Sequence, residues 1–96
     1  MKRPPSHPGE ILLELYLKPL EKSQTDLAKD IGVPLNRVNE VIKGKRGVSP
    51  DTALRLAKYF GTSADVWLNL QQNHDLWHAY QKAREDQSLD TIVPVA

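Results

Sequence analysis

The sequence predicts an all-α fold, a bundle of five short helices with a helical extension at its C-terminal end. Apolar residues recur at helical spacing in five stretches, and capping residues or prolines separate these stretches. No stretch shows the alternation of period two that is expected for a half-buried strand. With 96 residues, the chain is long enough for one small core plus short extensions.

The first two predicted helices are bounded by residues with special backbone preferences. Pro8 suits a first helical turn and Pro19 lacks the N–H that a helix interior needs, so the first helix lies between them. Ser23 is a good N-cap and Gly32 tolerates the positive φ of a helix end, so they bound the second helix. The expected apolar stripes are Ile11, Leu12 and Leu15 in the first helix, and Leu27, Ala28 and Ile31 in the second.

The third helix is predicted to begin at about Pro34 and to end before Gly44. Its apolar face consists of Val38, Val41 and Ile42. Only two or three residues connect it to the second helix, which is too few for comfortable antiparallel neighbours and favours a sharp crossing. The two helices therefore match a helix-turn-helix.

The fourth and fifth helices follow the same pattern of caps. Ser49 caps the fourth helix and Gly61 ends it, and either Thr62 or Ser63 caps the fifth. An interruption of the fifth helix is expected near Asn73. The apolar residues are Leu54, Leu56, Ala57 and Phe60 in the fourth helix, and Val66, Trp67, Leu70, Leu76, Trp77 and Tyr80 in the fifth.

Composition excludes several classes of protein. The chain has no cysteine, which excludes a disulfide framework and a thiolate metal site and suits a reducing cytoplasm. The basic N-terminus lacks the apolar segment of a signal peptide, and no apolar run approaches a membrane-spanning length. Its glycines are helix stops rather than a phosphate loop, and no nucleophile motif has a supporting context. We therefore expect no enzyme activity, no cofactor and no contact with a membrane.

Charge is distributed unevenly along the chain. Residues 1–62 carry 11 basic and 7 acidic side chains, a net charge of +4, whereas residues 63–96 carry 2 basic and 5 acidic ones, a net charge of −3. Such a division indicates an anionic partner for the first part, although scattered surface charge gives the same pattern by chance.

The outward face of the third helix has the side chains that read DNA. Amide, guanidinium and carboxylate groups recognise adenine, guanine and cytosine edges in the major groove, which admits one α-helix. A solvated helical hairpin would also have a polar face, but here the face follows a Gly32 turn and precedes a basic loop. The base-reading candidates are Leu35, Asn36, Arg37, Asn39 and Glu40, and the phosphate-binding candidates are Gln24, Thr25, Lys43, Lys45 and Arg46.

Several segments together resemble the HigA-type antitoxins of the lambda-repressor-like family, the branch also labelled virulence-associated protein I. They are HPGEILLE at 7–14, SQTDLA at 23–28, the stretch from Gly32 to Ser63, and WLNLQ at 67–71. The resemblance covers about residues 7–77. Its helix-turn-helix part is shared by many regulators, and the combination of HPGE, GKRG and WLNLQ is more specific.

The resemblance implies a function beyond DNA binding. The protein would be a five-helix, lambda-repressor-like domain that dimerises on an inverted-repeat operator and represses its own operon. It would also neutralise a HigB-type toxin, a RelE-like mRNA endonuclease, as the antitoxin of a type II toxin–antitoxin pair. The alternatives are a stand-alone helix-turn-helix regulator without a toxin partner and a protein-binding module that contacts DNA only weakly.

Partner contacts are expected away from the third helix. Aromatic residues often anchor interfaces, so the dimer interface is predicted at Leu70, Trp77 and Tyr80. The acidic C-terminal third is expected to face the dimer partner, and the surface that holds the toxin stays open. A basic toxin would favour acidic patches, and the resemblance implies toxin contacts at the first helices as well, where Glu10, Glu14 and Glu21 are candidates.

The remaining candidate site is the pair His74 and His78, which share a helix face. Such spacing can hold a metal, but no third ligand or adjacent Glu supports one, so surface or interface histidines are expected. The predicted organisation is a flexible arm at 1–6, a DNA-binding domain at 7–74, and an extension and tail at 75–96. That tail ends in apolar residues, and three alternatives stay open for it: loose chain, an added strand, or a segment that packs on a partner.

Overall fold

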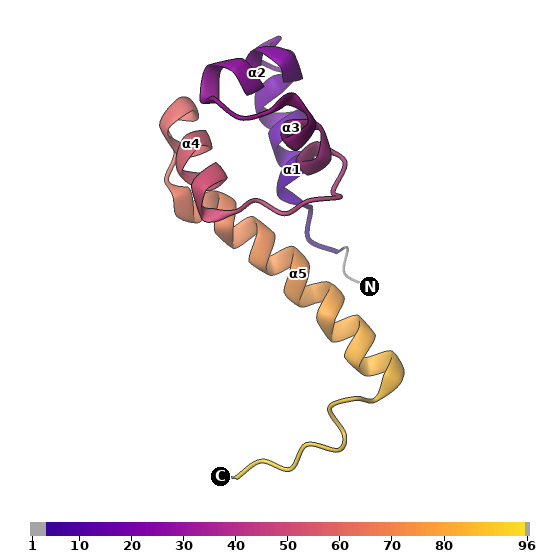
Figure 1. Ribbon diagram of the computed structural model, residues 1–96. Helices are drawn as coiled ribbons and strands as arrows, with labels where there is room; N and C mark the ends of the chain where they lie inside the picture. Colours follow the sequence, from indigo (N-terminus) through magenta and orange to yellow (C-terminus); the bar gives the residue numbers. More distant parts are fainter. Residues whose placement is uncertain (1–3, 96) are drawn as a thin grey trace.

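The computed structural model describes residues 4–95, and helices account for every regular element in that range. The elements are α1 (Pro8–Ile11), the π-helix η1 (Leu12–Leu17), α2 (Gln24–Ile31), α3 (Leu35–Ile42), α4 (Pro50–Phe60) and α5 (Ala64–Asp86). Figure 1 shows the first helices gathered around one core, with α5 leaving the bundle as a long rod. Because α1 and η1 follow each other directly and form one helical region, the predicted all-α, five-helix fold is confirmed.

The first helical region differs from the prediction. After one turn of α-helix, the chain continues as the π-helix η1, in which Lys18 N–H donates to the carbonyl of Leu13. The wider turn brings residues five apart to the same side, so Leu12 and Leu17 are buried whereas Leu15 is 62% exposed. The expected stripe through Leu15 is wrong, because it assumed the period of an α-helix.

The predicted caps are observed. The side-chain hydroxyls of Ser23, Ser49 and Ser63 accept hydrogen bonds from backbone N–H groups of the first turns of α2, α4 and α5. Both Gly32 and Gly61 have positive φ at the ends of α2 and α4. Pro34 is the N-cap of α3 rather than its first residue, a difference of one position.

The core lies among the five helices and is closed by Trp67 of α5. Trp67 is completely buried, and its indole N–H donates to the hydroxyl of Thr62 at 2.9 Å. Leu54, which belongs to the predicted apolar set of α4, is 63% exposed. The buried apolar residues are Leu12, Leu17, Leu27, Ala28, Ile31, Val33, Val38, Val41, Val48, Ala53, Leu56, Ala57 and Trp67.

Helix α5 is continuous, and the predicted interruption near Asn73 is wrong. Its N-terminal half packs on α4, whereas its C-terminal half extends away from the bundle (Figure 1). The radius of gyration is 16.1 Å, compared with about 12–13 Å for a compact domain of this length. The boundary predicted after residue 74 lies within this helix, and the tail after residue 91 has no regular structure up to residue 95.

Candidate DNA-binding interface

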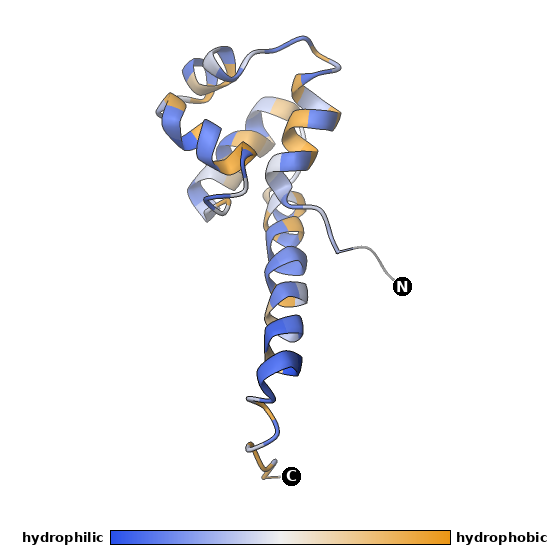
Figure 2. Ribbon diagram, turned by 90° about the vertical axis from the view of Figure 1, so that its right-hand side faces the viewer, coloured by the Kyte–Doolittle hydropathy of each residue, from blue (hydrophilic) through white to orange (hydrophobic). Residues whose placement is uncertain are grey.

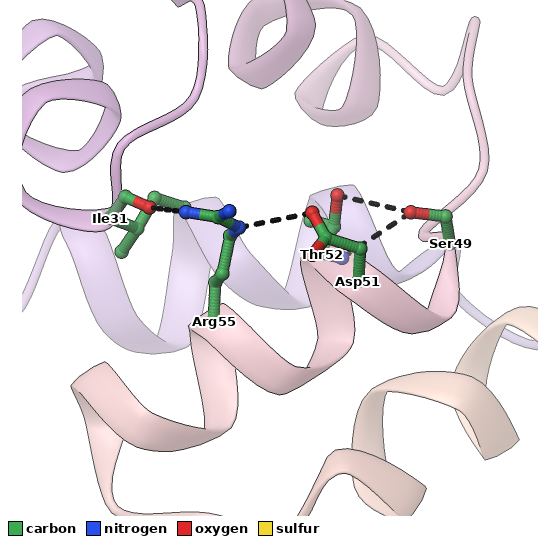
Figure 3. A network of polar contacts seen from close by, with 5 residues as sticks. All are labelled: Ile31, Ser49, Asp51, Thr52 and Arg55. Atoms are coloured by element: carbon green, nitrogen blue, oxygen red, sulfur yellow. Dashed lines mark hydrogen bonds and ion pairs between the residues drawn. The ribbon is translucent and has the colours of Figure 1, made fainter.

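The helix-turn-helix is held at its turn by a residue of α4. Gly32 ends α2 with φ of 74°, and the chain passes through Val33 into α3. Figure 3 shows Arg55 between this turn and its own helix: its Nη1 donates to the carbonyl of Ile31 at 2.7 Å, and its Nε donates to Asp51 at 3.0 Å. Arg55 thereby satisfies a carbonyl at the C-terminal end of α2 and fixes the crossing.

A second contact holds the other side of α3. Gly9 of α1 lies so close to α3 that a Cβ atom built on it would stand 1.9 Å from the carbonyl oxygen of Val41. Only glycine allows the two backbones to meet at this separation. The HPGE segment is recognisable in the sequence as a family segment, but this contact is not, because its partner Val41 lies far along the chain.

Helix α3 turns one face to the core and another to solvent. Val38 and Val41 are buried, Ile42 is half-buried, and Leu35 and Asn36 at the N-terminal end are exposed. The other base-reading candidates, Arg37, Asn39 and Glu40, are half-buried. All five candidates therefore have side-chain surface outside the core and belong to one short helix.

Asn39 is joined to the N-terminal end of α2. Its Nδ2 donates to Oε1 of Gln24 at 3.1 Å, so a predicted base-reading side chain and a predicted phosphate-binding side chain contact each other. This bond uses one amide hydrogen of Asn39 and one lone pair of Gln24. The carbonyl oxygen of Asn39 and the amide group of Gln24 retain their capacity for nucleic-acid contacts.

Glu40 organises the basic loop after α3. Its backbone carbonyl accepts from the N–H groups of Lys45 and Arg46, at 2.8 and 3.2 Å. Its carboxylate also accepts from Nε of Arg46 at 2.9 Å. The ion pair uses Nε of Arg46 and fixes the orientation of its guanidinium group. The hydrogen bonds to the carbonyl of Glu40 fix the backbone of Lys45 and Arg46 in the same way.

The other phosphate-binding candidates lie around the same face. Thr25 is exposed at the start of α2, and Lys43 and Lys45 are exposed at the C-terminal end of α3 and in the loop beyond. Together with Gln24, which bonds Asn39 in the middle of α3, and with Arg46, they place polar groups beside α3 and cations at its C-terminal end. Such groups at the edges of a reading helix suit the phosphates that flank a major groove.

The predicted dimer residues form a separate group on α5. Leu70 packs partly on the core, Trp77 is half-buried and Tyr80 is 56% exposed. Leu76, which is predicted on this helix but not in the interface, is 51% exposed. Figure 2 shows hydrophobic positions recurring along an otherwise hydrophilic α5 outside the bundle.

Within residues 4–95, no group of three potential metal-ligating side chains has a geometry that could hold an ion. His74 and His78 do pack together, with ring centroids 4.4 Å apart, and His7 joins them from the N-terminal side of α1.

In the same described range, none of the helices combines the length and apolar character needed to cross a bilayer.

Comparison with known proteins identifies the family to which this geometry belongs. The profile of the helix-turn-helix family matches residues 13–67. Virulence-associated protein I of Dichelobacter nodosus is 47% identical over 97% of this chain and 83% of its own. Antitoxin HigA-1 of Vibrio cholerae is 34% identical over 88% of this chain and 80% of its own. The chain belongs to the helix-turn-helix family of HigA-type antitoxins.

Solved structures agree with this assignment. The antitoxin HigA of Pseudomonas aeruginosa, solved with the higBA promoter, is 39% identical and superposes with a TM-score of 0.88 over 96% of this chain and 99% of its own. The antitoxin GraA in complex with its operator is 37% identical, with a TM-score of 0.88 over 100% of this chain and 98% of its own. The resemblance found in the sequence is thereby confirmed, and the lambda-repressor-like fold with it.

Proposed function

We propose that this protein is the antitoxin of a type II toxin–antitoxin pair, which represses its own operon and neutralises a HigB-like, RelE-type mRNA endonuclease. The observation that carries the proposal is the arrangement of α3, a polar helix braced by Gly9 and Arg55 and bordered by cations. Its relatives HigA and GraA were solved with promoter or operator DNA. A protein acting on operator DNA in this way works in the cytoplasm.

The proposed interface consists of residues that contact bases and residues that contact phosphates. Leu35, Asn36, Arg37, Asn39 and Glu40 would contact base edges in the major groove. Gln24, Thr25, Lys43, Lys45 and Arg46 would contact phosphates on either side. Glu40 would release Arg46 when it reads cytosine, at small cost, because both partners of this ion pair are 40% or more exposed.

A homodimer would place two α3 helices in successive major grooves, about 34 Å apart on an inverted repeat. We propose that the second half of α5 forms this dimer, with Leu70 at its border. Leu70 packs against the core, whereas Trp77 and Tyr80 lie further along the same helix and outside the core cluster. The exposed Leu76 adds to the same surface.

DNA binding is tested by electrophoretic mobility shift on the promoter upstream of the gene. Arg37→Ala and Asn36→Ala should each weaken operator binding by about 1–3 kcal/mol, with less effect on unrelated DNA. Lys45→Ala should weaken both DNAs similarly and reduce the salt dependence by about one charge. Lys58→Ala, an exposed cation of α4, serves as the control and should change little. Absence of a shift with the wild-type protein at low salt would refute the proposal.

Toxin neutralisation is tested by co-expression with a HigB-like, RelE-type toxin. A stable complex and rescue of growth are expected. If the two proteins neither co-purify nor restore growth while operator binding persists, the chain is a stand-alone helix-turn-helix regulator. A complex without operator binding would instead indicate a protein-binding module.

A further inference from the structure

Three histidines meet where α1, α3 and α5 come together. The ring of His7 contacts the ring of His74 edge-on, with centroids 4.9 Å apart, and His74 contacts His78. They line a cleft of about 540 Å³ that also includes Glu10, Lys43 and Gly44 among its walls. These are all the histidines of the chain, brought together from positions 7, 74 and 78.

His7 acts through a specific nitrogen. Its Nδ1 accepts a hydrogen bond from the N–H of Gly9 at 2.9 Å, so His7 is the side-chain N-cap of α1. An imidazole nitrogen accepts only when it carries no proton, so this cap exists only in the neutral tautomer protonated at Nε2. Protonation of Nδ1 removes the acceptor and also places a positive charge at the positive end of the helix dipole.

The cap holds the residue that positions α3. The N–H bonded to His7 belongs to Gly9, whose backbone meets the carbonyl of Val41 near the end of α3. The His7 ring also lies beside Gly44, where a Cβ atom would be 3.9 Å from two of its ring carbons. His7 therefore contacts the start of α1 and the end of α3 at the same time.

We propose that His7 is a positioning residue for the DNA-reading helix, and that the histidine cluster releases this helix when the medium becomes mildly acidic. In the neutral state, the cap holds Gly9 against α3, and His74 of α5 contacts the His7 ring. When His7 takes up a proton, the start of α1 separates from its neighbours and α3 loses the support of its C-terminal end. The inference rests on the proposed use of α3 for DNA binding.

The charges around His7 set the direction of the effect. Burial lowers the pKa of His7 below the ordinary value of 6.5, and the charge of His74 lowers it further, while Asp75 acts in the opposite direction. Glu10 of α1 would favour protonation and Lys43 of α3 would oppose it, and both line the cleft with His78 of α5. A lowered pKa means that the folded arrangement is fully stable above pH 6.5 and loses stability as the pH falls below that value.

The experiment compares operator affinity at pH 7.5 and pH 5.5 in the full-length protein and in His7→Asn. Asparagine is among the preferred N-cap residues and does not titrate in this range. The wild-type protein should lose about fivefold in affinity at the lower pH, the equivalent of one helix cap. His7→Asn should bind at pH 7.5 like the wild type and show little change at pH 5.5. Equal pH dependence in the two proteins would overturn the proposal.

Two further variants separate positioning from a general effect of acid. His74→Gln removes a charge that opposes protonation of His7, so its loss of affinity should begin at a higher pH. His78→Gln, whose ring contacts are with His74 and Trp77, should leave the profile close to that of the wild type. Histidine proton resonances followed by NMR should give His7 a midpoint below the ordinary value of 6.5. A His7 midpoint at or above the ordinary value would contradict the mechanism.

The test remains informative if the proposed function fails. Urea unfolding of the wild-type protein should show a loss of stability between pH 6.5 and pH 5.5 that His7→Asn lacks, whether or not DNA is bound. If the wild type fails to bind operator at pH 7.5 but shows this difference, the DNA-binding proposal is wrong and the histidine cap is supported. If it binds operator but the stability difference is absent, the histidine inference alone is wrong.

Discussion

At the scale of single residues, the contact most sensitive to change is the one made by Gly9. Gly9→Ala should destabilise the protein by about 3 kcal/mol, because its Cβ would overlap backbone atoms of Val41 that no side-chain rotation can move. Urea unfolding measures this loss. Gly47→Ala is the matched control: the three atoms nearest to a Cβ there all belong to the flexible side chain of Gln71, at 3.1 Å or more. Equal stability of the two variants would refute the close-packing explanation.

The pair formed by Gln24 and Asn39 belongs to the same scale. Gln24→Ala and Asn39→Ala should each relax discrimination at one base pair, and their effects should not add, because each variant breaks the same bond. A coupling energy of about 0.5–3 kcal/mol is expected for residues in direct contact. The measurement is a double-mutant cycle on operators carrying each base pair in turn. Fully additive effects at every position would show that Gln24 does not orient Asn39.

Single-residue features differed in how far the sequence could predict them. Ser23, Gly32 and Ser49 were predictable because caps and helix ends depend on local backbone geometry. The roles of Gly9 and His7 were not, because each depends on a partner brought near only by folding. The same holds for the candidate site residues. The helical period of the sequence predicts which residues of the third helix point outward, but it does not predict the hydrogen bonds between them and other helices.

At the scale of helices, the first helical region shows the limit of periodicity. The run LLELYL at 12–17 has leucines at a spacing that also fits an α-helix. The structure instead forms the wider π-helical turn, in which both Leu12 and Leu17 are buried in the core. The continuity of α5 through Asn73 is the opposite case, since a polar stretch weakened the expectation of a helix that nevertheless continues. Such ambiguities arise where tertiary packing, rather than local preference, decides the backbone.

The brace between α4 and the turn is testable at this scale. Arg55→Ala should lower the stability by about 1 kcal/mol, a discounted value because the Arg55 side chain is 43% exposed. Amide hydrogen exchange should increase selectively at the C-terminal end of α2, where the Ile31 carbonyl loses its partner. Lys58→Ala on the same helix is the control. Uniform acceleration of exchange throughout the molecule would indicate general destabilisation rather than loss of a local brace.

At the scale of the whole molecule, the shape of α5 predicts the assembly. Leu76 and Tyr80 are more than half exposed on a helix that leaves the bundle, and a second copy would cover them. Tyr80→Glu should convert the proposed dimer into a monomer in light-scattering measurements, because a carboxylate would be buried without a partner in that interface. Operator affinity should fall at the same time, since only a dimer contacts both half-sites, while the helical circular dichroism of the monomer is retained.

Asn69→Glu introduces the same charge at an exposed position nearer the start of α5 and should leave the protein dimeric. The two variants distinguish the interface from the general effect of adding acid to an already acidic C-terminal third. If Tyr80→Glu remains dimeric and binds operator normally, dimerisation involves another surface, and the extended half of α5 serves a different partner. If Tyr80→Glu is monomeric but keeps full affinity, the α3 helix of one subunit is sufficient for recognition and the inverted-repeat geometry is wrong.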